Sequence, residues 1–128
     1  MSNENSTPAP STTGGSSVQT LDPGARWCEL TGFRRDMLAA ISRLEQANEP
    51  CYGLAVQELL EKNHGQVHHG HLYTNLEALV EDGYVEKGEI DARTNSYALT
   101  DETRELLESA ARGLADACGL SVVDPAEG

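Results

Sequence analysis

Six residues whose side chains can hydrogen-bond or stack lie within eight consecutive positions: His68, His69, His71, Tyr73, Thr74 and Asn75. Asn can pair with adenine through two hydrogen bonds, and Thr offers a hydroxyl to a phosphate or a methyl group to thymine. If these residues begin a helix, its free N–H groups can also bind a phosphate. The cluster therefore predicts a DNA contact. The simpler alternative is that the histidines cap a helix and that Thr74 and Asn75 are ordinary exposed positions.

The histidines also raise the possibility of a metal site, because His64 and His68 are four residues apart and His68 and His71 are three apart. Gly65 is expected to break a helix between the first pair, and no Cys or carboxylate lies beside them in the sequence. We therefore predict no metal and no cofactor. The chain has three cysteines, Cys28, Cys51 and Cys118. Their spacing matches neither a zinc knuckle nor a disulfide framework.

Basic residues elsewhere in the chain are further candidates for DNA contact: Arg34, Arg35, Lys87 and Arg93. The polar Asn95, two residues after Arg93, is another. A basic residue at the tip of a hairpin can enter a minor groove, where the negative potential attracts it. The alternative for the hairpin residues is a solvated surface balanced by neighbouring carboxylates. No phosphate-binding Gly loop, nucleophile elbow or His-Glu-x-x-His motif is present, so no enzyme is predicted.

Three helices are predicted to position these residues. The first begins at the cap Thr31, ends before Pro50 and carries one apolar stripe, made by Phe33, Met37, Ile41 and Leu44. The second spans about residues 52–63 and is closed by Gly65. The third spans about residues 69–82, ends at Gly83 and buries Leu72, Leu76, Leu79 and Val80.

A period of two then predicts a short hairpin, with the turn Asp91-Ala92-Arg93-Thr94 between its strands. Thr100 is expected to cap a last helix over residues 101–119. The apolar side of this helix carries Leu106, Leu107, Ala110, Leu114 and Cys118, and its alanines would let two such helices approach closely. The predicted fold class is mainly α with a small β-hairpin (α+β), a winged helix-turn-helix over residues 26–100 followed by an added C-terminal helix. Residues 120–128 are predicted to be a flexible tail.

The composition indicates the salt concentration and the compartment in which such a protein would work. The 128 residues include 9 Lys plus Arg and 21 Asp plus Glu, giving a formal charge of −12, and Lys occurs only twice. We interpret this as adaptation to molar salt, where the Debye length is about 3 Å; an ordinary acidic protein is the alternative. Residues 1–25 include 17 Ser, Thr, Asn, Gly or Pro and are predicted to be disordered. Without an apolar run long enough for a membrane, the sequence predicts a soluble cytoplasmic protein.

Several segments together resemble the PadR family of transcriptional regulators. The segment Tyr52–Leu59 is similar to the family's second helix, and Gly70–Leu79 is similar to its recognition helix. Gly83-Tyr84-Val85 follows at the family's usual distance, and Arg93, Tyr97 and Leu99-Thr100 match the returning strand of its wing. The resemblance covers roughly residues 30–112, and the acidity points to the small PadR-like proteins of haloarchaea, some of which respond to oxidative stress.

The resemblance departs from the family at His68 and His71, where Ser or Thr and another polar residue are usual, and its wing is less basic than usual. It implies a homodimeric regulator that binds double-stranded DNA at a pseudo-palindromic promoter site. In that dimer residues 101–119 are the dimerisation helix, and the first helix contributes Phe33 to the interface. Two hypotheses from other classes stay open: a winged-helix protein-interaction module without DNA binding, and a metal or redox sensor that uses the histidines or cysteines.

Overall fold

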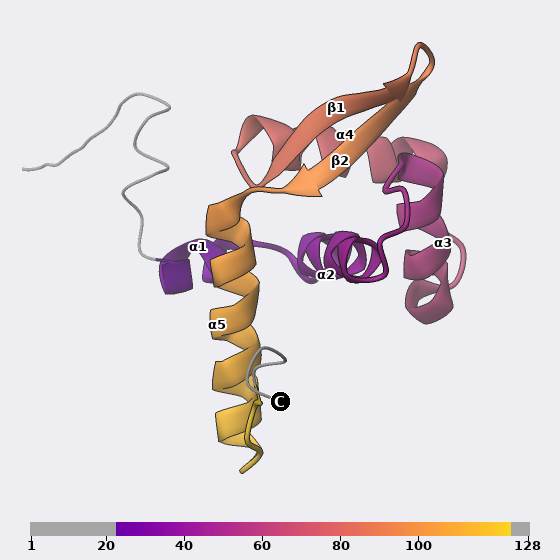
Figure 1. The fold of residues 1–128 in the computed structure, drawn as a ribbon. Coiled ribbons are helices and arrows are strands. Elements are labelled where there is room, and N and C mark those ends of the chain that lie inside the picture. Colours follow the sequence, from indigo (N-terminus) through magenta and orange to yellow (C-terminus); the bar gives the residue numbers. More distant parts are fainter. Residues whose placement is uncertain (1–22, 124–128) are drawn as a thin grey trace, which may run out of the picture.

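The computed structural model describes residues 23–123, which form five helices and one hairpin (Figure 1). The elements in chain order are α1 (Pro23–Glu29), α2 (Gly32–Gln46), α3 (Gly53–His64), α4 (His69–Glu81), β1 (Val85–Asp91), β2 (Thr94–Leu99) and α5 (Asp101–Ala117). The mainly α class with a β-hairpin is therefore confirmed. Residues 1–22 of the predicted disordered segment and residues 124–128 of the predicted flexible tail lie outside the described residues.

The helix boundaries follow the capping residues of the sequence. Thr31 caps α2, because its hydroxyl accepts a hydrogen bond from the Arg34 amide at 3.2 Å. Thr100 caps α5 in the same way through the Thr103 amide. Gly65, just past α3, has a φ of 74°, which glycine adopts readily because it has no Cβ atom and other residues rarely adopt.

Helix α1 was not predicted from the sequence, and it includes residues 23–25 of the segment expected to be disordered. Tertiary contacts attach α1 to the rest of the fold. The buried Arg26 guanidinium lies 4.1 Å from the centre of the Tyr84 ring and donates a hydrogen bond to the Asp82 carbonyl at 3.0 Å. A seven-residue helix has too few turns to be stable alone, so contacts that no local pattern reveals must hold it.

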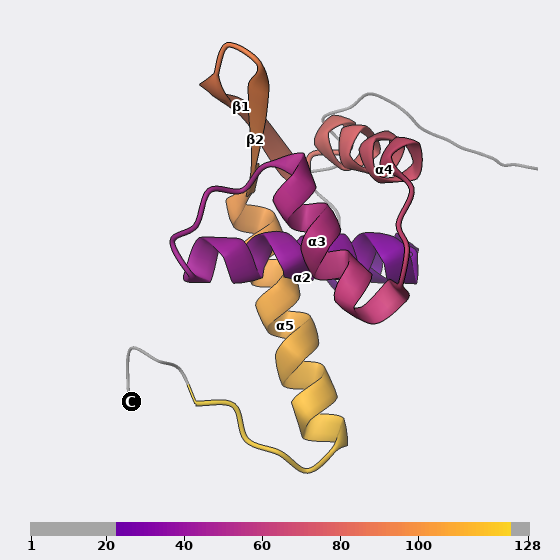
Figure 2. The ribbon, with the colours of Figure 1, turned by 90° about the vertical axis from the view of Figure 1, so that its right-hand side faces the viewer.

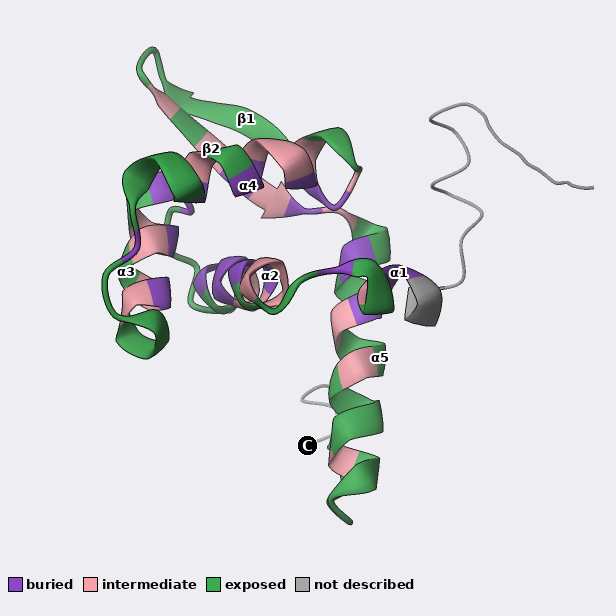
Figure 3. Ribbon diagram, turned by 180° about the vertical axis from the view of Figure 1, so that it is seen from behind, coloured by how far each residue is buried: buried purple, intermediate pink, exposed green. Residues whose placement is uncertain are grey.

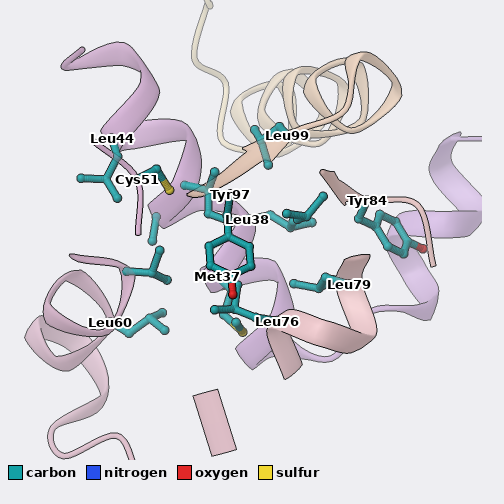
Figure 4. Close-up of a cluster of buried hydrophobic side chains, with 14 of the residues drawn as sticks. Met37, Leu38, Leu44, Cys51, Leu60, Leu76, Leu79, Tyr84, Tyr97 and Leu99 are labelled. Carbon is teal, nitrogen blue, oxygen red and sulfur yellow. The ribbon is translucent and has the colours of Figure 1, made fainter. Parts of the chain in front are cut away.

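Helix α2 lies at the centre of the hydrophobic core (Figure 4). Met37, Leu38 and Ile41 are fully buried there, and Leu76 of α4 and Tyr97 of β2 pack into the same cluster. The hairpin is tied to this core, since the Tyr97 amide donates to the Cys51 carbonyl at 3.0 Å, just before α3. A two-stranded hairpin is marginal alone, so this support keeps it in place.

The two ends of the molecule differ in character. Helix α4 and the hairpin lie at one end, and α5 extends away from them at the other end (Figures 1 and 2). Only the first turns of α5 are buried, and the rest of it is largely exposed (Figure 3). No helix within residues 23–123 is both long enough and apolar enough to cross a membrane.

Candidate nucleic-acid interface

The N-terminal half of α4 presents an uncharged polar surface. His68 is the N-cap and makes no capping hydrogen bond with its side chain, while His69, His71 and Thr74 are exposed. All four therefore lie where the sequence analysis expected them, at the beginning of the second helix of a helix-turn-helix. In such a motif these positions meet base edges and phosphates.

Tyr73 has mainly a packing contact. Its ring lies 4.4 Å from that of His69, and its hydroxyl is so close to Gly53 that a Cβ atom at position 53 would collide with it. Glycine at the start of α3 therefore allows α4 to approach closely. Tyr73 is only partly buried, so some of its surface remains available to a ligand.

Asn75 is not an exposed position as the sequence analysis supposed, since only 9% of it is accessible. Its Oδ1 atom accepts a hydrogen bond from Arg34 Nε at 2.8 Å, and its Nδ2 atom donates to the His71 carbonyl at 2.8 Å. The amide thus connects α4 to the beginning of α2. This placement is at odds with the expectation that Asn75 pairs with a base.

Phe33 and His64 form a contact with α4 that the sequence did not reveal. Phe33, which is also predicted to lie at a dimer interface, packs between the rings of His64 at 5.4 Å and His71 at 4.6 Å. His64 Nε2 lies 2.7 Å from Asp36 Oδ2, so its carboxylate partner comes from α2 and not from its own segment. Within residues 23–123, no three His, Cys, Asp or Glu side chains are grouped to hold a metal ion.

The hairpin forms a wing beside α4. Lys87 of β1 donates to both carboxylate oxygens of Glu77 in α4, at 3.0 and 3.2 Å, and this contact raises the pKa of Lys87. Arg93 and Asn95 are exposed at the tip. The predicted turn is confirmed: the Arg93 amide donates to Asp91 Oδ1 at 2.9 Å, which lowers the pKa of Asp91.

The two basic residues at the start of α2 have different surroundings. Arg34 lies next to α4 through Asn75. Arg35 donates from Nε and Nη2 to the Trp27 carbonyl at 3.2 and 2.9 Å, and its guanidinium stacks 5.1 Å from the Trp27 ring. The structure therefore places Arg34 beside the candidate interface and binds Arg35 to α1.

The residues predicted at a dimer interface are divided between two environments. Leu106 is 2% exposed and belongs to the chain's own core, which corrects its assignment as a surface contact. In the single chain Leu114 is 70% exposed, and Cys118 is also exposed. An open, mainly apolar groove of about 820 Å³ runs between α5 and the α1–α2 pair, lined among others by Trp27, Ala39, Leu107, Ala110 and Leu114.

Comparison with known proteins decides the family. The sequence model of the transcriptional regulator PadR-like family matches residues 41–109, more than half of the chain. The chain belongs to the PadR-like family of transcriptional regulators. Its winged helix-turn-helix fold and a DNA-binding regulatory function, in place of an enzymatic one, follow from that membership.

Solved structures of RosR from Halobacterium salinarum are similar to this PadR-like chain. The complex of RosR with S4 shares 35% identity and a TM-score of 0.68, over 79% of this chain and 84% of RosR. RosR grown from NaBr shares 37% identity and a TM-score of 0.62, over 73% and 82%. No curated protein sequence gives a significant match to this chain.

Proposed function

We propose that this PadR-like regulator acts as a homodimer that binds specific promoter sequences in the cytoplasm of a high-salt cell. The observation that carries the proposal is the separation of two surfaces. An uncharged polar face on α4, flanked by the wing, lies at one end, and the apolar side of α5 lies at the other. Each subunit would place α4 in a major groove and the wing beside the adjacent minor groove.

The polar face of α4 suits binding in concentrated salt. Affinity normally comes from neutralising phosphates and releasing counterions, and this release contributes little when the salt concentration is already molar. His68, His69, His71 and Thr74 offer hydrogen bonds that do not depend on that release. The net charge of −12 supports the same setting, because it would oppose DNA binding at low ionic strength.

The homodimer is supported by apolar surface that the single chain leaves uncovered. Leu114 projects from α5 beside the groove, and Leu120, Val122 and Val123 follow with 66%, 45% and 70% exposure. Alanines along the groove would let two helices approach closely. A two-fold dimer implies a pseudo-palindromic site whose half-sites lie about one helical turn apart, or a multiple of it.

We further propose an oxidative-stress signal, which the resemblance to haloarchaeal PadR-like proteins implies. The test is genome-wide DNA occupancy of the tagged protein in its high-salt cell, with and without oxidant. Promoter peaks that share a palindrome are expected, and their loss under oxidant would identify the stimulus. In the same experiment the variant Thr74→Ala should lower the peaks without lowering protein abundance. Absence of enrichment under both conditions would contradict the proposal and favour an interaction module.

A further inference from the structure

The Asn75 amide has its hydrogen-bonding groups engaged inside the protein. Oδ1 accepts from Arg34 Nε at 2.8 Å. One Nδ2 hydrogen is directed to the His71 carbonyl at 2.8 Å, and Nδ2 also lies 3.4 Å from His71 Nδ1. Two-point pairing with adenine needs the same oxygen and the same amino group, so reading a base would require breaking these contacts.

Arg34 is oriented by this contact. Its Nε–H is engaged by Asn75, while no hydrogen bond from Nη1 or Nη2 forms within residues 23–123. These two nitrogens form the edge of the guanidinium that can bind a phosphate with two parallel hydrogen bonds. A guanidinium already held in place loses less side-chain entropy when it binds.

His71 is constrained by the same amide and by Phe33. The Phe33 ring packs 4.6 Å from the imidazole, which limits its rotation. Because an amide NH₂ group can only donate, the contact between Asn75 Nδ2 and His71 Nδ1 requires Nδ1 to be the acceptor. In neutral His71 the proton then resides on Nε2. His71 is an exposed residue of α4. An Nε2–H there is a donor that suits N7 or O6 of a purine, or O4 of thymine, in a major groove.

We propose that Asn75 is a positioning residue, which holds Arg34 for a DNA phosphate and holds His71 as an Nε2–H donor toward a base edge. The DNA contacts rest on the function proposed above. The network itself exists in the free protein, so it can be tested separately.

The first experiment is ¹⁵N NMR of the free protein at a pH where His71 is neutral. The wild type should show His71 protonated on Nε2 and a slowly exchanging Arg34 Nε–H. Asn75→Asp keeps an acceptor for Arg34 but replaces the amide donor with a carboxylate, so it should retain the slow Arg34 Nε–H and move the His71 proton to Nδ1. Asn75→Ala should lose the slow exchange, and Asn63→Ala, exposed on α3, is the control. Wild-type His71 protonated on Nδ1, or Arg34 exchange unchanged by Asn75→Ala, would overturn the proposal.

The second experiment is a double-mutant cycle on DNA of random sequence, where only backbone contacts matter. Arg34→Ala and Asn75→Ala should each weaken binding, by about three- to tenfold if one phosphate contact is lost, and the double variant should be no weaker than Arg34→Ala alone. Additive effects would show that Asn75 acts independently of Arg34 and would overturn the proposal. A loss by Asn75→Ala that is confined to one base pair of the specific site, with binding to random DNA unchanged, would instead make Asn75 a base-reading residue. A wild type that binds no DNA would refute the proposed function and leave the NMR result to decide the network.

Discussion

Lys87 on the wing and Glu77 in α4 join the two elements expected to meet DNA, with the Lys87 Nζ atom 3.0 and 3.2 Å from the two carboxylate oxygens. The pair is exposed, so it adds little to the stability of the fold. Its importance is electrostatic. The chain has two lysines, and Glu77 neutralises the charge of one of them, Lys87. Lys87 is therefore less available to a DNA phosphate beside the wing.

Removing the Glu77 charge should therefore strengthen DNA binding. Glu77→Gln leaves Lys87 available to a phosphate, so affinity should rise and the slope of log affinity against log salt should become steeper by about one ion. Lys87→Ala should weaken binding, and both variants should melt close to the wild-type temperature. Fluorescence anisotropy over a range of KCl concentrations measures the slope, with Glu58→Gln on the exposed side of α3 as the control. A fall in affinity for Glu77→Gln would show that this contact positions the wing instead of masking Lys87.

Arg93 at the wing tip is expected to contact the DNA backbone or the minor groove. Arg93→Ala should weaken binding similarly on specific and random sequences and reduce the salt slope by about one. The control is Arg112→Ala, which removes another exposed charge from α5, at the other end of the molecule. Competition anisotropy with both DNAs separates the outcomes. If Arg93→Ala binds as tightly as the control, the wing does not touch DNA.

Much of the fold could be predicted because its signals are local. Thr31 and Thr100 cap helices with their own hydroxyls, and the turn at residues 91–94 is closed by the Asp91 side chain. Helix α1 had no such signal, because Arg26 and Tyr84 are 58 positions apart in the chain. The same reason hid the pairing of His64 with Asp36.

The sequence predicted which residues form the candidate site, but not the hydrogen bonds between them. Leu72, Leu76 and Leu79 define the inward side of α4, and Asn75 is three residues after the first and four before the last, on the same side. That spacing was a usable signal for its burial. The partner Arg34 could not be predicted, since only the packing of α2 against α4 brings the two side chains together.

The three thiols should differ in reactivity. Burial, with a smaller effect from the Glu45 charge, raises the pKa of Cys51 from its ordinary value of 9.0 to about 11, whereas Cys28 and Cys118 are exposed. At pH 8 only about one Cys51 in a thousand is then a thiolate, by the definition of the pKa. An aromatic disulfide reagent should label two thiols quickly and the third only after unfolding. Rapid labelling of all three in the folded protein would contradict the burial of Cys51.

Cys51 also gives the fold a pH dependence with a definite sign. A raised thiol pKa means that the folded state favours the protonated form, so its contribution to stability is complete below pH 9 and is lost as the pH rises toward about 11. The free energy of urea unfolding should therefore fall more steeply over this range for the wild type than for Cys51→Ala. Parallel curves for the two proteins would show that the thiol does not couple to folding.

Leu114 provides the sharpest test of the dimer. Truncation before Asp101 would abolish a dimer built on α5, but it would also remove Leu106 and Thr103 from the core and confuse the result. Leu114→Ser leaves the core intact and should raise the dimer dissociation constant at least about tenfold, because burying one leucine contributes about 1.5–3 kcal/mol. Light scattering after size exclusion in molar KCl measures the change. The control is Leu54→Ser, since Leu54 is also an exposed leucine, at 52%, but lies on α3. Equal weakening by both substitutions, or by neither, would remove the α5 groove as the dimer interface.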